Sequence, residues 1–164
     1  MSELQTSLPA TLVSPGASAT NGRHAPAALG LCLVVSTSPR RAQLLVRAAH
    51  EEQWSTIVCS TAEDALRQSV RQRVDLALVD LQSALPADEP VLRLLVEQLA
   101  ARNGPLLAVC GKSDDTTGEV WSRQLGVWIY LPGVDSQSDI ALLCAEARNI
   151  LQKLASPPAR TVRK

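Results

Sequence analysis

The chain has 164 residues, of which 46% are hydrophobic and 20% charged, so it can form one domain with a buried core and is too apolar to be disordered throughout. Aromatic side chains are scarce, which argues against a stacking platform for single-stranded nucleic acid. Sixteen basic and sixteen acidic residues cancel, so no global charge draws the protein to nucleic acid or to a membrane.

The two ends of the chain differ in composition from the region between them. Residues 1–30 are rich in Ser, Ala and Pro, and we expect a flexible leader there. Residues 155–164 carry three basic side chains and a Pro pair, and we expect a short basic tail. The intervening residues 31–154 hold 15 acidic and 12 basic residues, which points to protein partners first. No run of 18 apolar residues occurs, so we expect no membrane insertion.

Five short apolar runs alternate with helical patterns along residues 31–154. Nearly continuous apolar runs are typical of strands buried on both faces of a parallel sheet. The predicted strands are residues 31–35, 56–59, 76–79, 106–110 and 127–131. The predicted helices are residues 39–52, 62–72, 90–102, 114–124 and 136–154, with Ser38 and Thr61 as N-caps of the first two. The fourth helix has the weakest pattern, because Thr116, Thr117 and Gly118 fall in one turn.

This alternation predicts an α/β fold: a single doubly wound (βα)5 domain of the flavodoxin-like kind, with a five-stranded parallel sheet of order 2-1-3-4-5. In such a sheet, ligands bind at the carboxyl ends of the first and third strands, where the strand order reverses. Ser36 and Thr37 follow the first strand, and Asp80 follows the third.

The cysteines and histidines argue against several chemistries. Four cysteines, Cys32, Cys59, Cys110 and Cys144, stand in apolar segments without a CxxC spacing, and we interpret them as reduced core residues of a cytoplasmic protein. The two histidines are too few and too isolated for a triad or a metal pair. We therefore assign no catalytic residue and no metal site, and we do not expect an enzyme.

At these residues the chain resembles the receiver domain of bacterial response regulators, the CheY-like family. The segment VDLALVDLQ, residues 74–82, is similar to the family's third strand, which ends in the phosphoacceptor aspartate, here Asp80. The segments GPLLAVC and VWIYLPG are similar to its fourth and fifth strands, with Pro132 after the fifth. The resemblance covers residues 31–154.

Four positions depart from the family's pattern. Ser36 and Thr37 stand where the resemblance implies two acidic ligands of Mg²⁺, so a hard dication would find only Asp80. Cys110 stands where a Ser or Thr is implied, and Leu131 where a lysine is implied. Because phosphoryl transfer needs the phosphoryl charge to be neutralised, these changes favour a degenerate receiver.

The sequence allows two interpretations of Asp80. It is either a working phosphoacceptor or a carboxylate that remains at a strand end, solvated or capping a nearby amide. Asp114 and Asp115 are within reach of the same edge but are better explained as acidic residues of the first turn of a helix. Lys112 is a candidate for the missing lysine, although a solvated loop lysine explains it more simply.

Three aromatic residues, Trp121, Trp128 and Tyr130, fall in the region that the resemblance assigns to partner binding. Trp and Tyr are enriched at the energetic centres of interfaces, although packing against the sheet explains each residue singly. Homodimerisation through the fourth and fifth helices is implied by the resemblance only. Trp54, just before the second strand, is expected to cover the core.

Three functions stay open. The first hypothesis is a pseudo-receiver that signals through protein contacts, independently of phosphorylation and without a cofactor. The second is a stand-alone response regulator phosphorylated on Asp80 with Mg²⁺. The third is a flavodoxin-like domain that binds a small ligand at its hydroxyl-rich residues 36–39, although these lack a glycine-rich phosphate loop. None of the three includes nucleic-acid binding by this chain.

Overall fold

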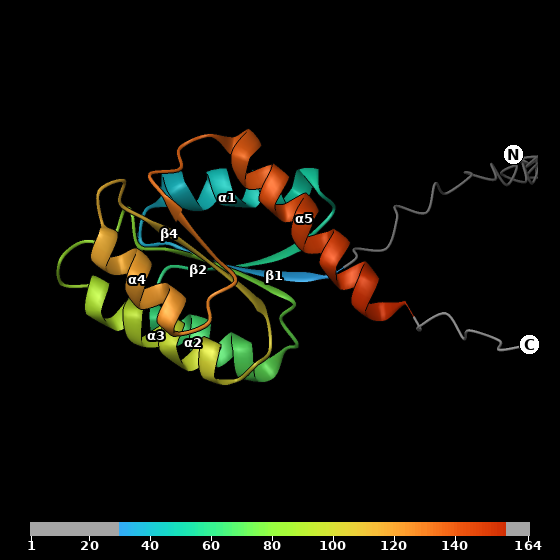
Figure 1. Cartoon of the computed structure of the whole chain (residues 1–164), viewed down its shortest axis with the longest axis horizontal. Coiled ribbons are helices and arrows are strands. Elements are labelled where there is room, and N and C mark those ends of the chain that lie inside the picture. The colour runs from blue at the N-terminus through green and yellow to red at the C-terminus, as the bar shows by residue number, and fades with distance from the viewer. Residues whose placement is uncertain (1–29, 157–164) are drawn as a thin grey trace, which may run out of the picture.

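The computed structural model describes residues 30–156, which form a five-stranded parallel sheet between two layers of helices (Figure 1). The sheet order is β2-β1-β3-β4-β5, which confirms the predicted topology. The strands are β1 (Leu31–Val35), β2 (Ser55–Cys59), β3 (Leu76–Asp80), β4 (Leu106–Gly111) and β5 (Ile129–Pro132). The helices are α1 (Pro39–Glu51), α2 (Ala62–Arg71), α3 (Glu89–Ala101), α4 (Thr116–Gln124) and α5 (Gln137–Ala155).

The predicted element bounds hold to within one or two residues. The side chain of Ser38 caps α1 by accepting a hydrogen bond of 3.4 Å from the Arg41 amide, and Thr61 caps α2 at 3.2 Å from the Asp64 amide. The weakly patterned fourth helix forms, but it begins at Thr116, with Asp115 as its N-cap. β5 begins at Ile129, two residues later than predicted. Apart from Gly30, Ala155 and Ser156, the expected leader and basic tail lie outside the described residues.

Each face of the sheet has its own core. Residues at alternate positions of each strand point to opposite faces, so Leu76 and Leu78 face α1 and α5, while Ala77 and Val79 face α2 and α3. The strands β1, β3 and β4 are almost wholly buried, as the sequence pattern predicted. Trp54 covers the amino end of the α1–α5 core and donates a hydrogen bond of 3.1 Å from Nε1 to the Cys144 carbonyl.

The four cysteines are buried and unpaired, as expected for core residues. Burial raises the pKa of all four thiols, to about 12 for Cys110 and Cys144. No helix in residues 30–156 is long and apolar enough to cross a membrane.

Candidate functional site

Asp80 is the last residue of β3, and its side chain is fully buried on the face that α1 and α5 cover. The Ser36 hydroxyl donates a hydrogen bond of 2.8 Å to Oδ2, and the Gln82 amide donates one of 3.1 Å to Oδ1. The expectation of a solvated carboxylate is therefore wrong, whereas capping of a nearby amide is confirmed. The topology brings these groups together because β1 and β3 are neighbours and end at the same edge of the sheet.

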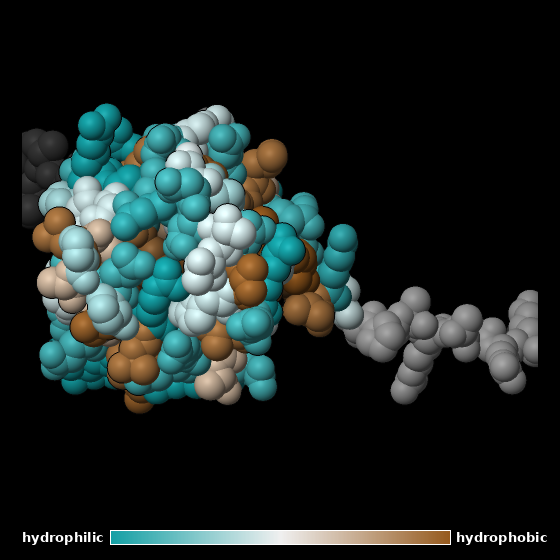
Figure 2. All heavy atoms as spheres, turned by 60° about the vertical axis from the view of Figure 1, so that its left-hand side comes forward, coloured by the Kyte–Doolittle hydropathy of each residue, from teal (hydrophilic) through white to brown (hydrophobic). Residues whose placement is uncertain are grey.

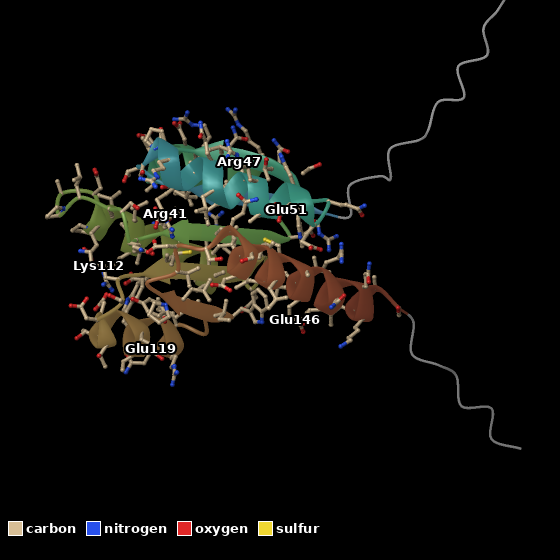
Figure 3. All side chains as sticks on the ribbon, turned by 90° about the horizontal axis from the view of Figure 1, so that it is seen from above. Arg41, Arg47, Glu51, Lys112, Glu119 and Glu146 are labelled. Carbon is tan, nitrogen blue, oxygen red and sulfur yellow. The ribbon has the colours of Figure 1, made fainter. Side chains whose placement is uncertain are left out.

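Arg41 supplies a positive charge beside this carboxylate. Its side chain is 10% exposed, and Nε lies 3.7 Å from Asp80 Oδ1. One terminal nitrogen donates to the Val134 carbonyl at 2.6 Å and lies 3.4 Å from Asp135 Oδ1, and the other donates to Gln82 Oε1 at 3.2 Å. In Figure 3 Arg41 reaches in from α1 over the end of the sheet. The guanidinium thus joins three segments that are distant in the sequence around Asp80.

Arg41 is the functional residue that sequence reasoning missed. It follows Arg40, and the residue type alone does not distinguish the two arginines. Arg40 is exposed, whereas Arg41 is buried by its contacts with the loop after β5, more than 90 residues away in the sequence. The one sequence signal was a basic residue at an otherwise buried position of α1, next to Ala42 and one turn before Leu45.

The residues around Asp80 do not fit a divalent metal ion. Ser36 and Thr37 are uncharged, and the Ser36 hydroxyl already donates a hydrogen bond to Asp80 itself. Asp135 is 80% exposed and is held by Arg41 and by the Gln82 amide group, at 2.8 Å. Among residues 30–156, no three His, Cys, Asp or Glu side chains gather where they could hold a metal ion. With a guanidinium beside the carboxylate, a hard dication would meet a like charge.

Cys110 and Leu131 complete the surroundings of Asp80 without adding a charged donor. Cys110 is the β4 residue in register with Asp80, and Leu131 is the β5 residue in register with Cys110. Burial, followed by the nearby Asp80 carboxylate, raises the pKa of the Cys110 thiol to about 12, so the thiol stays protonated. Leu131 packs against the core of α1 and α5. Neither residue offers a cation to a phosphoryl group.

Among the other charged candidates, Lys112 and Asp115 pair with residues other than Asp80. Lys112 Nζ lies 3.6 Å from Glu89 Oε2 and is half exposed. Asp115 caps α4, accepting a hydrogen bond of 2.8 Å from the Gly118 amide, and also pairs with Arg93 at 3.1 Å. Asp115 is thus the N-cap of α4, and Asp114 precedes it and is exposed, so neither lies in the first turn of the helix as expected, because the helix begins only at Thr116.

The three aromatic candidates pack against two different cores. Trp121 and Tyr130 pack on the face of the sheet covered by α2 and α3, whereas Trp128 packs against the core of α1 and α5. The Trp121 ring lies under the Arg93 guanidinium at 4.5 Å and donates a hydrogen bond to Glu97 at 3.3 Å. Trp128 therefore packs in a different core from Trp121 and Tyr130, and a partner face that includes these three residues stays a prediction.

Tyr130 is held in a slot made by two glycines. A side chain at Gly111 would collide with the Tyr130 hydroxyl, and one at Gly118 would collide first with the Asp115 carboxylate and then with this hydroxyl, so both positions admit only glycine while the ring is in place. The Tyr130 hydroxyl donates a hydrogen bond of 3.4 Å to Asp115. Burial, followed by the charge of Asp115, raises the pKa of Tyr130 to about 12. The ring is thus fixed between β4 and α4.

The molecular surface at this end of the sheet is mixed in character. Figure 2 brings the carboxyl ends of the strands forward and shows apolar side chains scattered among hydrophilic ones, without one continuous apolar patch.

Comparison with known proteins bears on the fold alone. No model of a known protein family matches the chain, and no curated protein matches it. Solved structures with the same fold include a CheY-like response regulator receiver domain protein from Methanospirillum hungatei JF-1. It is 18% identical, with a TM-score of 0.66, over 77% of this chain and 98% of that one.

Two further structures give the same result. The REC domain of AraT, a response regulator from Geobacillus stearothermophilus, is 17% identical, with a TM-score of 0.63, over 78% of this chain and 99% of that one. A response regulator from Thermotoga maritima is 15% identical, with a TM-score of 0.63, over 73% of this chain and 98% of that one. The chain therefore has the fold of receiver domains.

Proposed function

We propose that this chain is a receiver-like signalling module that acts through protein contacts and is not switched by phosphorylation of Asp80. The observation that carries the proposal is the pairing of Arg41 with the buried Asp80. A fixed guanidinium stands beside the carboxylate that a phosphorylated receiver would offer to a metal ion and a phosphoryl group.

The chemistry of phosphoryl transfer supports this proposal. Attack of a carboxylate on a phosphoryl group requires an accessible oxygen and cations placed to neutralise the transferred charge. Both oxygens of Asp80 accept hydrogen bonds, one from Ser36 and one from the Gln82 amide, and the side chain has no exposed surface. A donor phosphate would have to displace these contacts and the Arg41 side chain.

The partner is proposed to be a protein, because residues 31–154 are mildly acidic and the fold is that of signalling receivers. A cytoplasmic location goes with this proposal, since the four unpaired, buried thiols suit a reducing compartment. We assign no catalytic residue and no cofactor.

The test is a two-dimensional amide NMR spectrum of the full chain, recorded with and without Mg²⁺ and beryllofluoride, a mimic of aspartyl phosphate. We expect the amide shifts of Asp80, Gln82 and Cys110 to stay unchanged. Shifts at these amides that extend to Tyr130 and α4 would overturn the proposal in favour of a working phosphoacceptor. A parallel incubation with acetyl phosphate, followed by intact mass measurement, should add no phosphoryl group.

A further inference from the structure

A cavity lies at the opposite end of the sheet from Asp80. Its volume is about 710 Å³, and Trp54, Val74, Leu151 and Leu154 provide its apolar lining. It lies at the amino ends of the strands, between β3 and the last turns of α5. None of its lining residues belongs to the Asp80 site, so the two features are separate.

The cavity leaves apolar surface of α5 uncovered. This helix extends to Ala155, and its last turns project beyond the amino end of the sheet (Figure 1). As a result Leu154 is 75% exposed, and Leu151 is only half-buried against the core. Leu151 and Leu154 beside this hollow leave apolar surface that a further segment would stabilise by covering it, whereas Trp54 below them is already buried.

The chain enters the domain at this cavity. The Gly30 carbonyl accepts a hydrogen bond of 3.1 Å from the Ser55 amide, and the Leu31 amide donates one of 3.1 Å to Asp75, which lines the cavity. A Cβ atom at Gly30 would lie 2.7 Å from the Trp54 ring, so only glycine allows this approach. The 29 residues before Gly30 are therefore attached at the mouth of the cavity.

We propose that residues 4–13 of this chain dock into the cavity, with Leu4, Leu8 and Leu12 against Leu151 and Leu154. These three leucines recur every four residues and account for most of the large aliphatic side chains before Gly30. The 18 residues from Leu12 to Gly30 span up to about 60 Å when extended, which is ample for a return to the attachment point. Attachment also gives the segment an effective concentration on the order of millimolar.

Charge favours this segment over the basic residues at the other end of the chain. The acidic groups near the cavity already have partners, because Arg73 pairs with Asp75 at 3.6 Å and Arg148 pairs with Glu52 at 3.0 Å. No uncompensated carboxylate of the described cavity lining is left to attract the basic residues 160–164. Residues 4–13 carry no charge, so they can cover the apolar lining without disturbing either ion pair.

Hydrogen exchange of the full chain, followed by mass spectrometry, tests the docking. We expect the amides of residues 4–13 to exchange at least about tenfold more slowly than in a synthetic peptide of residues 1–29. The variant Leu154→Gln should restore fast exchange, and it should fold because Leu154 is exposed. Leu142→Gln is the matched control, since Leu142 is 74% exposed on the same helix and is not among the residues that line the cavity.

A second readout uses variants outside the folded domain. The double variant Leu8→Ser/Leu12→Ser should shift the methyl resonances of Leu151 and Leu154 and leave those of Leu142 in place. Exchange of residues 4–13 as fast as in the peptide would overturn the proposal. Protection that survives Leu154→Gln would also overturn it by placing the segment elsewhere, for example in the apolar groove between α2 and α3. Protection that disappears on dilution would show that a second copy holds the segment.

Discussion

Arg41 and Asp80 form an ion pair that joins a helix to the centre of the sheet. Nε of Arg41 lies 3.7 Å from the Asp80 carboxylate, and the same guanidinium binds the Val134 carbonyl at 2.6 Å. A metal ion bound beside a carboxylate exchanges with the solution, whereas the Arg41 guanidinium is part of the chain and cannot dissociate. The charge that Arg41 places beside Asp80 is therefore independent of the Mg²⁺ concentration.

The substitution Asp80→Asn should destabilise the protein by about 2–4 kcal/mol, because the buried Arg41 loses its buried counter-charge and keeps only the exposed Asp135 as an acidic partner. The free energy of unfolding, measured by urea denaturation at neutral pH, checks this expectation. The sign of the change in unfolding free energy is informative. In a site built from several carboxylates, removal of one negative charge would relieve repulsion and stabilise the fold, which is the opposite of the loss expected here. An Asp80→Asn protein more stable than the wild type would contradict the ion pair described above.

The variant Arg41→Met tests the same pair from the other side. It should cost a similar amount, because Asp80 loses its cation and the Val134 carbonyl loses a donor. The double variant with Asp80→Asn should cost less than the sum of the two single variants, with a coupling of about 0.5–3 kcal/mol. Arg47→Met, at an exposed position of the same helix, is the matched control and should change stability by less than about 0.5 kcal/mol.

Tyr130 should make the fold sensitive to alkaline pH. Burial and the nearby Asp115 raise its pKa from 10.0 to about 12, so the folded state holds the phenolic proton more tightly than the unfolded state. This contribution to stability is complete below pH 10 and is lost as the pH rises from 10 to 12. The advantage of the wild type over Tyr130→Phe in the free energy of unfolding should shrink across that range.

Because Tyr130 is the one tyrosine of the chain, phenolate absorbance in a pH titration reports on this residue alone. Its midpoint in the folded protein should lie above that of the urea-unfolded protein. Coincident midpoints would show that the hydroxyl is not held as described.

The variant Gly111→Ala should destabilise the protein by about 1–3 kcal/mol, because the new methyl group collides with the Tyr130 hydroxyl. Thermal and urea denaturation measure the loss. Adding Tyr130→Leu to Gly111→Ala should recover part of it, since leucine is shorter and has no hydroxyl. Gly104→Ala is the control: a Cβ there meets nothing within 4 Å, so no loss is expected. Equal losses for the two glycines would argue against the slot.

The thiols should react slowly in the folded protein. Cys32, Cys110 and Cys144 are fully buried and Cys59 is 5% exposed, and burial raises the pKa of each, which lowers the fraction of reactive thiolate. With iodoacetamide at pH 8, mass spectrometry should find Cys59 labelled first and all four labelled rapidly in urea. Faster labelling of Cys110 than of Cys59 would mean that the surroundings of Asp80 open to solvent.

The sequence was sufficient for the fold because parallel strands buried on both faces leave apolar runs that are easy to recognise. The runs at Leu76 and Leu106 mark the central strands to within a residue. At the edge of the sheet β5 is only half-buried, and its start was placed two residues too early, where Val127 and Trp128 continue the apolar run beyond the hydrogen-bonded strand.

The candidate site was predictable only in part. Asp80 and Ser36 followed from their places at the ends of neighbouring strands, because the topology fixes which ends meet, whereas Cys110 and Leu131 were implied only by the resemblance. The role of Arg41 did not follow, because it depends on contacts with Val134 and Gln82 that local spacing does not encode. The separation of Trp128 from Trp121 likewise arises only when β5 is placed between the two layers of helices.

The last residue of β5 limits how copies of the domain can meet. β5 is an edge strand of four residues that ends at Pro132, which has no backbone N–H to donate. Such a short edge, blocked at one end, is a poor template for adding a strand from another molecule. A continuous sheet running through two molecules is therefore disfavoured at β5, and any self-association on this side would have to be made by helix surfaces.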